Sequence, residues 1–129
     1  CLVIHTEVEF LPMYINQPLF SDVEMFLRGK GFVFHRFAPL VSRIVSPMII
    51  DDDIYRGLSQ MFWADAVFIR DFTKLSRLPP EKLLKFSIIL HDIYNSYDLV
   101  LRILMAHDDQ TATNYAELYL KELERMANE

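Results

Sequence analysis

The fold of this 129-residue chain is indicated first by its opening stretch, Leu2-Val3-Ile4-His5-Thr6-Glu7-Val8-Glu9-Phe10. Its first half is apolar at successive positions, which is typical of a strand covered on both faces. Its second half alternates, with Thr6, Val8 and Phe10 on one face and Glu7 and Glu9 on the other. We therefore predict a strand of an α/β sheet. Because a core strand stands at the very first residues, we also expect the chain to be a fragment of a longer protein.

A helix is predicted next, after a loop at residues 11–19 that contains two prolines. Ser21 and Glu24 fit the S-x-x-E capping box that opens a helix. Gly31 stands where a left-handed residue commonly ends one. The spacing therefore predicts a helix that begins at Ser21 and ends before Gly31.

Two further strands are predicted at residues 32–37 and 62–70, because both segments are rich in aromatic and β-branched residues. One helix between the first two strands indicates a parallel crossover. The third strand could run in either direction, because alternation alone does not reveal the direction of a strand.

The connection at residues 38–61 is long for a compact domain. Within it, Ile54, Leu58 and Met61 have near-helical spacing, so we expect a short helix capped by an aspartate of residues 51–53. These adjacent aspartates are a poor metal site, because neighbouring side chains in a loop point in different directions.

From Pro79 onward the hydrophobic period changes from two to about 3.6, which predicts a series of helices. Pro79 and Pro80 fit a first helical turn. The apolar stripe of the first helix is expected to comprise Leu83, Phe86, Leu90, Ile93, Tyr94 and Tyr97. Asp98 is expected to cap a second helix, and a third follows it.

Composition excludes several classes of function. The net charge is -5 and the 13 lysines and arginines are scattered, which speaks against nucleic acid as a partner. No apolar run approaches the roughly 18 residues of a spanning helix, so no membrane segment is expected. The chain shows no signal peptide, and Cys1 cannot form an internal disulfide, so we expect a cytoplasmic protein. The four histidines lack metal-ligand spacing, so no metal site is expected.

Two parts of the chain resemble the C-terminal half of FkbM-type S-adenosylmethionine-dependent methyltransferases. They are Thr6-Glu7-Val8-Glu9-Phe10-Leu11-Pro12-Met13-Tyr14 with Gln17-Pro18-Leu19-Phe20-Ser21-Asp22, and Trp63-Ala64-Asp65-Ala66-Val67-Phe68-Ile69-Arg70-Asp71. The resemblance implies that residues 1–71 are the C-terminal portion of a Rossmann-like methyltransferase domain and that residues 72–129 are a helical extension packed on it. The three strands would then form a mixed sheet, with the last strand inserted antiparallel between the other two.

The resemblance also implies O-methylation of a hydroxyl on a small molecule or glycan, with S-adenosylmethionine as the cofactor of the parent protein. The family binds this cofactor mainly on the first half of its sheet, at a glycine-rich turn. The only glycines here are Gly29, Gly31 and Gly57. No cofactor-binding residue can be carried over, so we expect no cofactor bound to this chain and no catalysis by it alone.

Glu7 and Glu9 are the candidate catalytic residues. They project from the carboxyl end of a strand, where open α/β sheets bind their ligands. Methyl transfer to an alcohol needs a base near the hydroxyl or a group that orients it, and either carboxylate could serve. The alternative is that both are solvated or bonded to loop amides.

Tyr14 and Gln17, in the following loop, are candidate substrate-binding residues, with packing of the loop as the favoured alternative. On the last strand, Trp63 is expected in the core and Asp65 as a structural polar link. His5 is expected on a packed face of its strand.

Two functions follow from these expectations. The first is the C-terminal part of a methyltransferase. The second is a non-catalytic interaction or dimerisation module, because the edge of the first strand invites pairing with a second copy of the chain. A homodimer through this edge is compatible with both.

Overall fold

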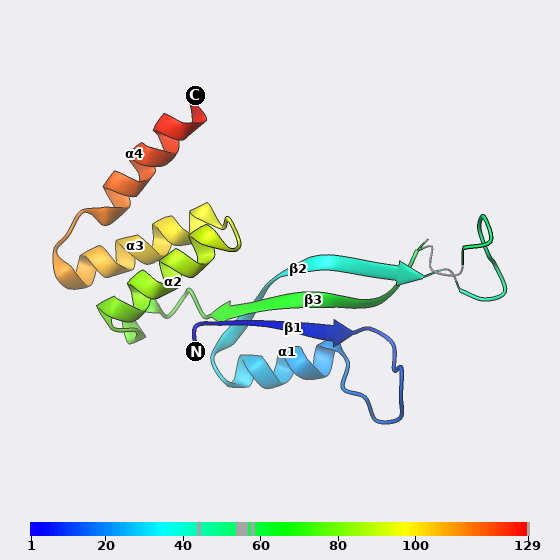
Figure 1. Ribbon diagram of the computed structural model, residues 1–129. Helices are drawn as coiled ribbons and strands as arrows, with labels where there is room; N and C mark the ends of the chain where they lie inside the picture. The colour runs from blue at the N-terminus through cyan, green and yellow to red at the C-terminus, as the bar shows by residue number, and fades with distance from the viewer. Residues whose placement is uncertain (44, 54–56, 58, 129) are drawn as a thin grey trace. The chain divides into compact units, whose positions relative to one another are not determined.

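The computed structural model describes residues 1–43, 45–53, 57 and 59–128, without the side chains of residues 39–43. The described elements are β1 (Val3–Glu9), α1 (Phe20–Gly29), β2 (Phe32–Arg43), β3 (Gln60–Arg70), a 3-10 turn at Leu75–Arg77, α2 (Pro80–Asp92), α3 (Tyr97–Thr111) and α4 (Tyr115–Ala127) (Figure 1). The chain divides into a unit of Cys1 with Val3–Arg70 and a helical unit of Leu2 with Asp71–Glu129.

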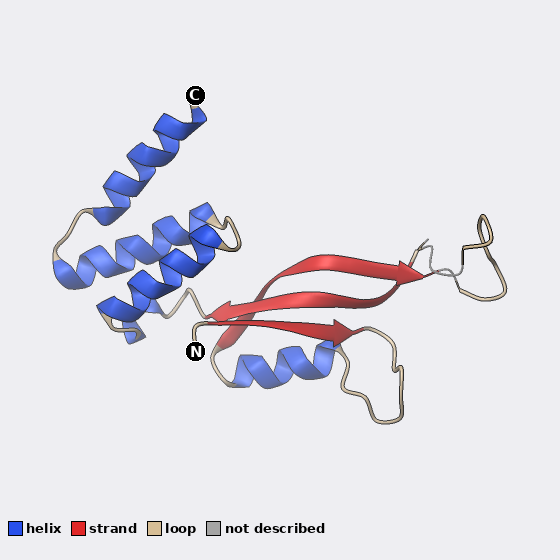
Figure 2. Cartoon of the chain, viewed as in Figure 1, coloured by secondary structure: helices blue, strands red, loops and turns tan. Residues whose placement is uncertain are grey.

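The strands of the first unit form one sheet in the order β1-β3-β2, with β3 antiparallel to both neighbours (Figure 2). The expectation of a mixed sheet is therefore wrong for these three strands, because both hydrogen-bonded pairs are antiparallel. The expected central, reversed position of the last strand is found. β1 and β2 run parallel to each other across β3, as the helix between them indicated.

Helix α1 covers one face of this sheet (Figure 1). An aromatic core lies between the helix and the sheet. Val8 and Phe68 are fully buried there, against apolar side chains of the helix. The Phe68 ring lies 5.7 Å from that of Phe34 and 6.4 Å from that of Phe20, measured between ring centroids. Edge-to-face and offset contacts of this kind add to the free energy gained from burial.

The start of α1 differs from the predicted capping box. The helix begins at Phe20, and the carboxylate of Asp22 accepts the Leu19 N–H at 2.9 Å. Glu24 does not reach back to the cap, because it pairs with Arg28 one turn further on (Nε to Oε1, 3.0 Å). An acidic side chain still stabilises the first turn, but it belongs to a different residue from the one predicted.

The end of α1 depends on Gly31, whose φ of 89° is strained for residues with a Cβ. A Cβ there would also lie 3.2 Å from Nη1 of Arg70. We expect Gly31→Ala to lower the free energy of unfolding by roughly 1–2 kcal/mol. Gly29→Ala is the matched control: Gly29 is the last residue of the helix and has open space around it, so the substitution should raise stability by roughly 0.5 kcal/mol. Urea denaturation followed by Trp63 fluorescence measures both, and equal effects of the two variants would contradict the expectation.

Strand β2 is longer than predicted and continues to Arg43. Its register with β3 shifts between Phe37 and Leu40, next to Pro39. Because proline cannot donate to the ladder, it is accommodated on an edge strand at an irregularity rather than ending the strand. The sequence pattern therefore misplaced the end of this strand.

The connection after β2 also differs from the prediction. Met61 lies in β3, so it is not part of a helix, whereas Ile54 and Leu58 lie outside the described residues. Asp51 and Asp52 have positive φ, and Asp53 N–H donates to Ile50 O at 3.0 Å. Asp51, Asp52 and Asp53 thus form a tight turn, which the tolerance of aspartate for left-handed backbone explains.

The helical unit contains α2, α3 and α4, in agreement with the predicted series. Leu83, Phe86, Leu90 and Ile103 are fully buried between α2 and α3 and form its core. The predicted stripe fails at Ile93, which is 64% exposed, and at Tyr97, which belongs to α3. Both follow from the end of α2 at Asp92, where the helical period stops. Within the described part of the chain, no helix has the length and apolarity needed to cross a membrane.

The start of α4 is held by a carboxylate from the preceding helix. Asp108 of α3 accepts hydrogen bonds from the N–H groups of Tyr115 (3.0 Å) and Ala116 (2.8 Å) and from Oγ1 of Thr113 (2.6 Å). The buried His107 ring stacks on Tyr115 at 5.1 Å. Asp108 thus provides the capping interaction that a helix start requires.

Candidate functional site

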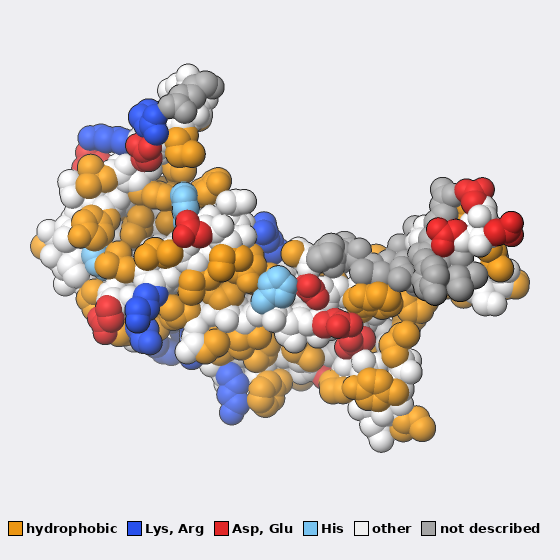
Figure 3. Space-filling view, viewed as in Figure 1, with side chains coloured by type: hydrophobic (Ala, Val, Ile, Leu, Met, Phe, Trp, Pro, Cys, Tyr) orange, Lys and Arg blue, Asp and Glu red, His pale blue; other side chains and the backbone are white. Residues whose placement is uncertain are grey.

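Glu7 and Glu9 lie on the face of the sheet opposite α1. Alternation along β1 places Val8 toward the helix and the two glutamates on the other side. Glu7 is exposed, Glu9 is half-buried, and Glu9 is the last residue of the strand. In Figure 3, acidic side chains gather beside a histidine over β1 and β3. The structure therefore brings the two predicted catalytic candidates together at the carboxyl end of β1.

His5 and Asp65 complete this polar cluster. Nε2 of His5 lies 3.3 Å from Oδ2 of Asp65, and each side chain is 43% exposed. The predicted role of Asp65 as a polar link is confirmed, but His5 is exposed rather than packed. Asp65 also lies opposite Glu7 in the β1–β3 register. The cluster of Glu7, Glu9, Asp65 and His5 is called the acidic face below.

The two glutamates influence each other electrostatically. Partial burial raises the pKa of Glu9, and its hydrogen bond to Glu7 and the negative charge of Glu7 raise it further. Glu9 therefore retains a proton at a higher pH than an isolated glutamate does. A carboxylate with a raised pKa is a stronger base, so Glu9 is the better placed of the two to exchange a proton with a bound hydroxyl.

Trp63 lies opposite Glu9 in the register of β1 with β3. It is half-buried, whereas the sequence predicted a core position. A half-buried indole next to a carboxyl pair offers a flat apolar surface beside a polar group. This combination suits a ligand with a hydroxyl and an apolar ring face.

Tyr14 and Gln17 lie together in the loop after β1. Gln17 N–H donates to Tyr14 O at 3.3 Å, and Oε1 of Gln17 accepts the Met13 N–H at 2.7 Å. Gln17 thus stabilises the loop through its side chain. Tyr14 is 63% exposed. In the described part of the chain, no hydrogen bond joins this pair to Glu7 or Glu9.

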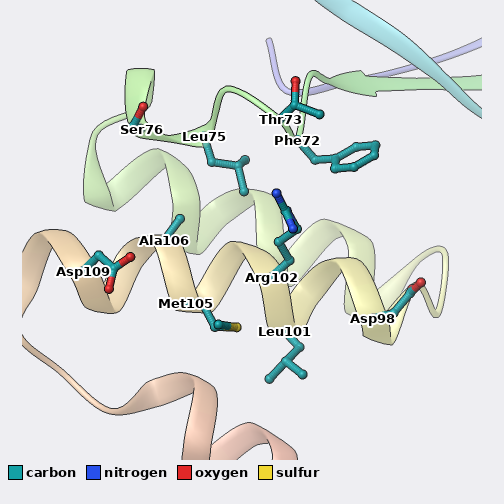
Figure 4. A pocket seen from close by; sticks show the side chains of 10 residues that line it. All are labelled: Phe72, Thr73, Leu75, Ser76, Asp98, Leu101, Arg102, Met105, Ala106 and Asp109. Atoms are coloured by element: carbon teal, nitrogen blue, oxygen red, sulfur yellow. The ribbon is translucent and has the colours of Figure 1, made fainter.

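Sequence reasoning missed a pocket in the helical unit. It has a volume of about 530 Å³ and is lined by the segment after β3 and by α3 (Figure 4). The guanidinium of Arg102 lies 5.9 Å from the centre of the Phe72 ring, while Asp98 and Asp109 lie at opposite ends. The pocket could hold a small molecule, but its carboxylates are not paired as they are on β1. No periodic signal connects the two lining segments, so the sequence could not reveal it.

A metal ion needs several converging ligand side chains, and a nucleotide cofactor is commonly held by a glycine-rich turn between a strand and a helix. Among the described residues, no group of three or more His, Cys, Asp or Glu side chains is arranged to hold a metal ion. Gly29 lies in α1 and Gly31 ends that helix, so neither forms a turn between a strand and a helix. Gly29 and Gly31 therefore do not fit the phosphate- or nucleoside-binding turn of a nucleotide fold.

Comparisons with known protein families, curated proteins and solved structures find no match to this chain.

Proposed function

We propose that this chain is the C-terminal part of a Rossmann-like S-adenosylmethionine-dependent methyltransferase similar to the FkbM group. The observation that supports this most is the order β1-β3-β2 with a reversed central strand and α1 between β1 and β2. The resemblance to the FkbM group implies this arrangement, with β1, β3 and β2 as the fifth, seventh and sixth strands of the sheet. The carboxyl ends of β1 and β2 would then lie on the ligand-binding side.

In this proposal the chain contributes the acceptor side of the active site. Glu9 accepts a proton from the acceptor hydroxyl or orients it, and partial burial together with the neighbouring Glu7 raises the pKa of Glu9. Trp63 supports the apolar face of the acceptor. In the proposal the donor is bound by residues outside these 129, because Gly29 and Gly31 lie at the end of a helix and not in a strand-to-helix turn.

Two measurements test the assignment. Calorimetric titration of this chain with S-adenosylmethionine should give no saturable heat, and a micromolar site would contradict the proposed division of the protein. The coding sequence upstream of Cys1 should encode a strand followed by a glycine-rich turn and a helix. An upstream coding sequence without that pattern would contradict the methyltransferase assignment.

The acceptor role predicts a kinetic effect in the product of the complete gene. Glu9→Gln should lower kcat about 100-fold, the usual size of a lost general base. Glu124→Gln, on the exposed side of α4, is the matched control and should leave kcat unchanged. Equal rates for the two variants would show that Glu9 plays no direct part.

A second candidate function is self-association, and the position of β1 favours it. β1 is an edge strand of the sheet, and an apolar groove of about 470 Å³ runs between it and α1. An apolar strand edge of this kind favours pairing with another strand.

A further inference from the structure

We propose that β1 pairs antiparallel with β1 of a second copy, in a two-fold arrangement centred on Thr6. The inference deepens the second candidate function, rests on it and concerns these 129 residues alone, because the methyltransferase assignment places further strands of the sheet outside them. Its physical basis is the hydrogen-bonding pattern of β1, the charge pattern of the acidic face and the groove beside α1.

The hydrogen-bonding pattern shows which residues face the open edge. Phe10 N–H donates to Phe62 O at 2.9 Å, in the same register that joins Val3 to Ile69. Because hydrogen-bonded pairs alternate along an antiparallel ladder, the even-numbered residues of β1 bond to β3. The backbone groups of the odd-numbered residues from Val3 to Glu9 therefore point toward the edge, where another strand can bond to them.

The charge pattern selects the register. Glu7 lies opposite Asp65 and on the same strand face as Glu9, so it is surrounded by acidic side chains, which destabilise a sheet. Centring the two-fold axis on Thr6 places His5 of each copy opposite Glu7 of the other. Centring it on Glu7 would instead oppose two glutamates, and centring it on His5 would oppose two histidines. Among these registers, the Thr6 register opposes neither two glutamates nor two histidines, and it overlaps the whole strand from Val3 to Glu9.

The groove beside α1 adds apolar contact in the same arrangement. Ile4 and Thr6 of β1 line it together with Val23, Phe26 and Leu27 of α1. Phe26 is 64% exposed, although it lies on the apolar side of the helix. The two-fold axis at Thr6 brings the grooves of both copies together, so each covers the other, as an isologous interface requires.

Cysteine cross-linking tests the register directly, in a Cys1→Ser background. In the proposed pairing the two Thr6 residues are directly opposite, at a Cα separation of about 4.5 Å, which suits a disulfide. Thr6→Cys should therefore give a covalent dimer under mild oxidation. Ile4→Cys is the matched control: the two Ile4 residues would lie about 13 Å apart, so it should stay monomeric.

Sedimentation at high micromolar concentration tests the association itself. The unmodified chain should dimerise, and Glu7→Lys should weaken the dimer about tenfold, because it removes both of the cross-strand His5–Glu7 pairs in each dimer. Glu124→Lys on α4 should have no such effect. A chain that stays monomeric overturns both the inference and the self-association function. If the unmodified chain dimerises but Thr6→Cys gives no covalent dimer, the proposed register is wrong although the self-association stands.

Discussion

Replacing Phe68 by alanine is expected to unfold most of the Val3–Arg70 unit. Phe68 has no exposed surface and packs against Phe20 and Phe34 in the layer between the sheet and α1. Truncating a buried phenylalanine costs about 3–5 kcal/mol, from lost burial and from the cavity that remains. That is a large part of the total stability of a unit this small. Urea denaturation followed by fluorescence of Trp63, the only tryptophan, measures the loss in this unit.

The matched control for the Phe68→Ala variant is Phe26→Ala on α1. Phe26 is 64% exposed, so in dilute monomeric solution its removal should change stability by no more than about 0.5 kcal/mol. The helices after Arg70 have their own buried core, so their ellipticity should persist in Phe68→Ala. Equal destabilisation by both variants would show that the aromatic layer does not carry the stability of the sheet.

The sequence revealed which segments are strands and helices because periodicity is a local property. Alternation in β1 and the 3.6 period after Pro79 both correspond to observed elements. Element ends were harder to predict, because they depend on tertiary contacts. β2 continues past Pro39 because it still pairs with β3 beyond a register shift, and the acidic residue that bonds the start of α1 is Asp22 rather than Glu24. The direction of β3 followed only from the family resemblance, since alternation is the same in both directions.

The same difference between local pattern and tertiary contact applies to the candidate site. Glu7 and Glu9 share a face because they are two residues apart in a strand, which the sequence alone indicates. The contact of His5 with Asp65 joins residues 60 positions apart and depends on the β1–β3 register. No local pattern determines that register. The sequence therefore identified the glutamates but not the groups that surround them.

Replacing Asp108 is expected to release α4. Its carboxylate receives three hydrogen bonds at the start of that helix, from Thr113, Tyr115 and Ala116. Removing this capping charge with Asp108→Asn should cost about 2 kcal/mol and reduce the helical ellipticity. Amide exchange at Tyr115 and Ala116 should accelerate at the same time. Asp109→Asn, at the adjacent exposed position, is the matched control and should change neither measurement.

The stabilisation that the Asp108 carboxylate provides should decrease as the pH falls. Burial raises its pKa, but the hydrogen bonds from Thr113, Ala116 and Tyr115 outweigh this and hold the pKa below its ordinary value of 3.8. A group with a lowered pKa contributes its stability above the unfolded value and loses it as the pH falls through the folded value. The wild-type chain should therefore be more stable than Asp108→Asn at neutral pH, and the difference should shrink below pH 3.8. Subtracting the two pH profiles removes the contributions of the other carboxylates. A difference that does not change with pH would show that α4 is held by packing and not by the charge of Asp108.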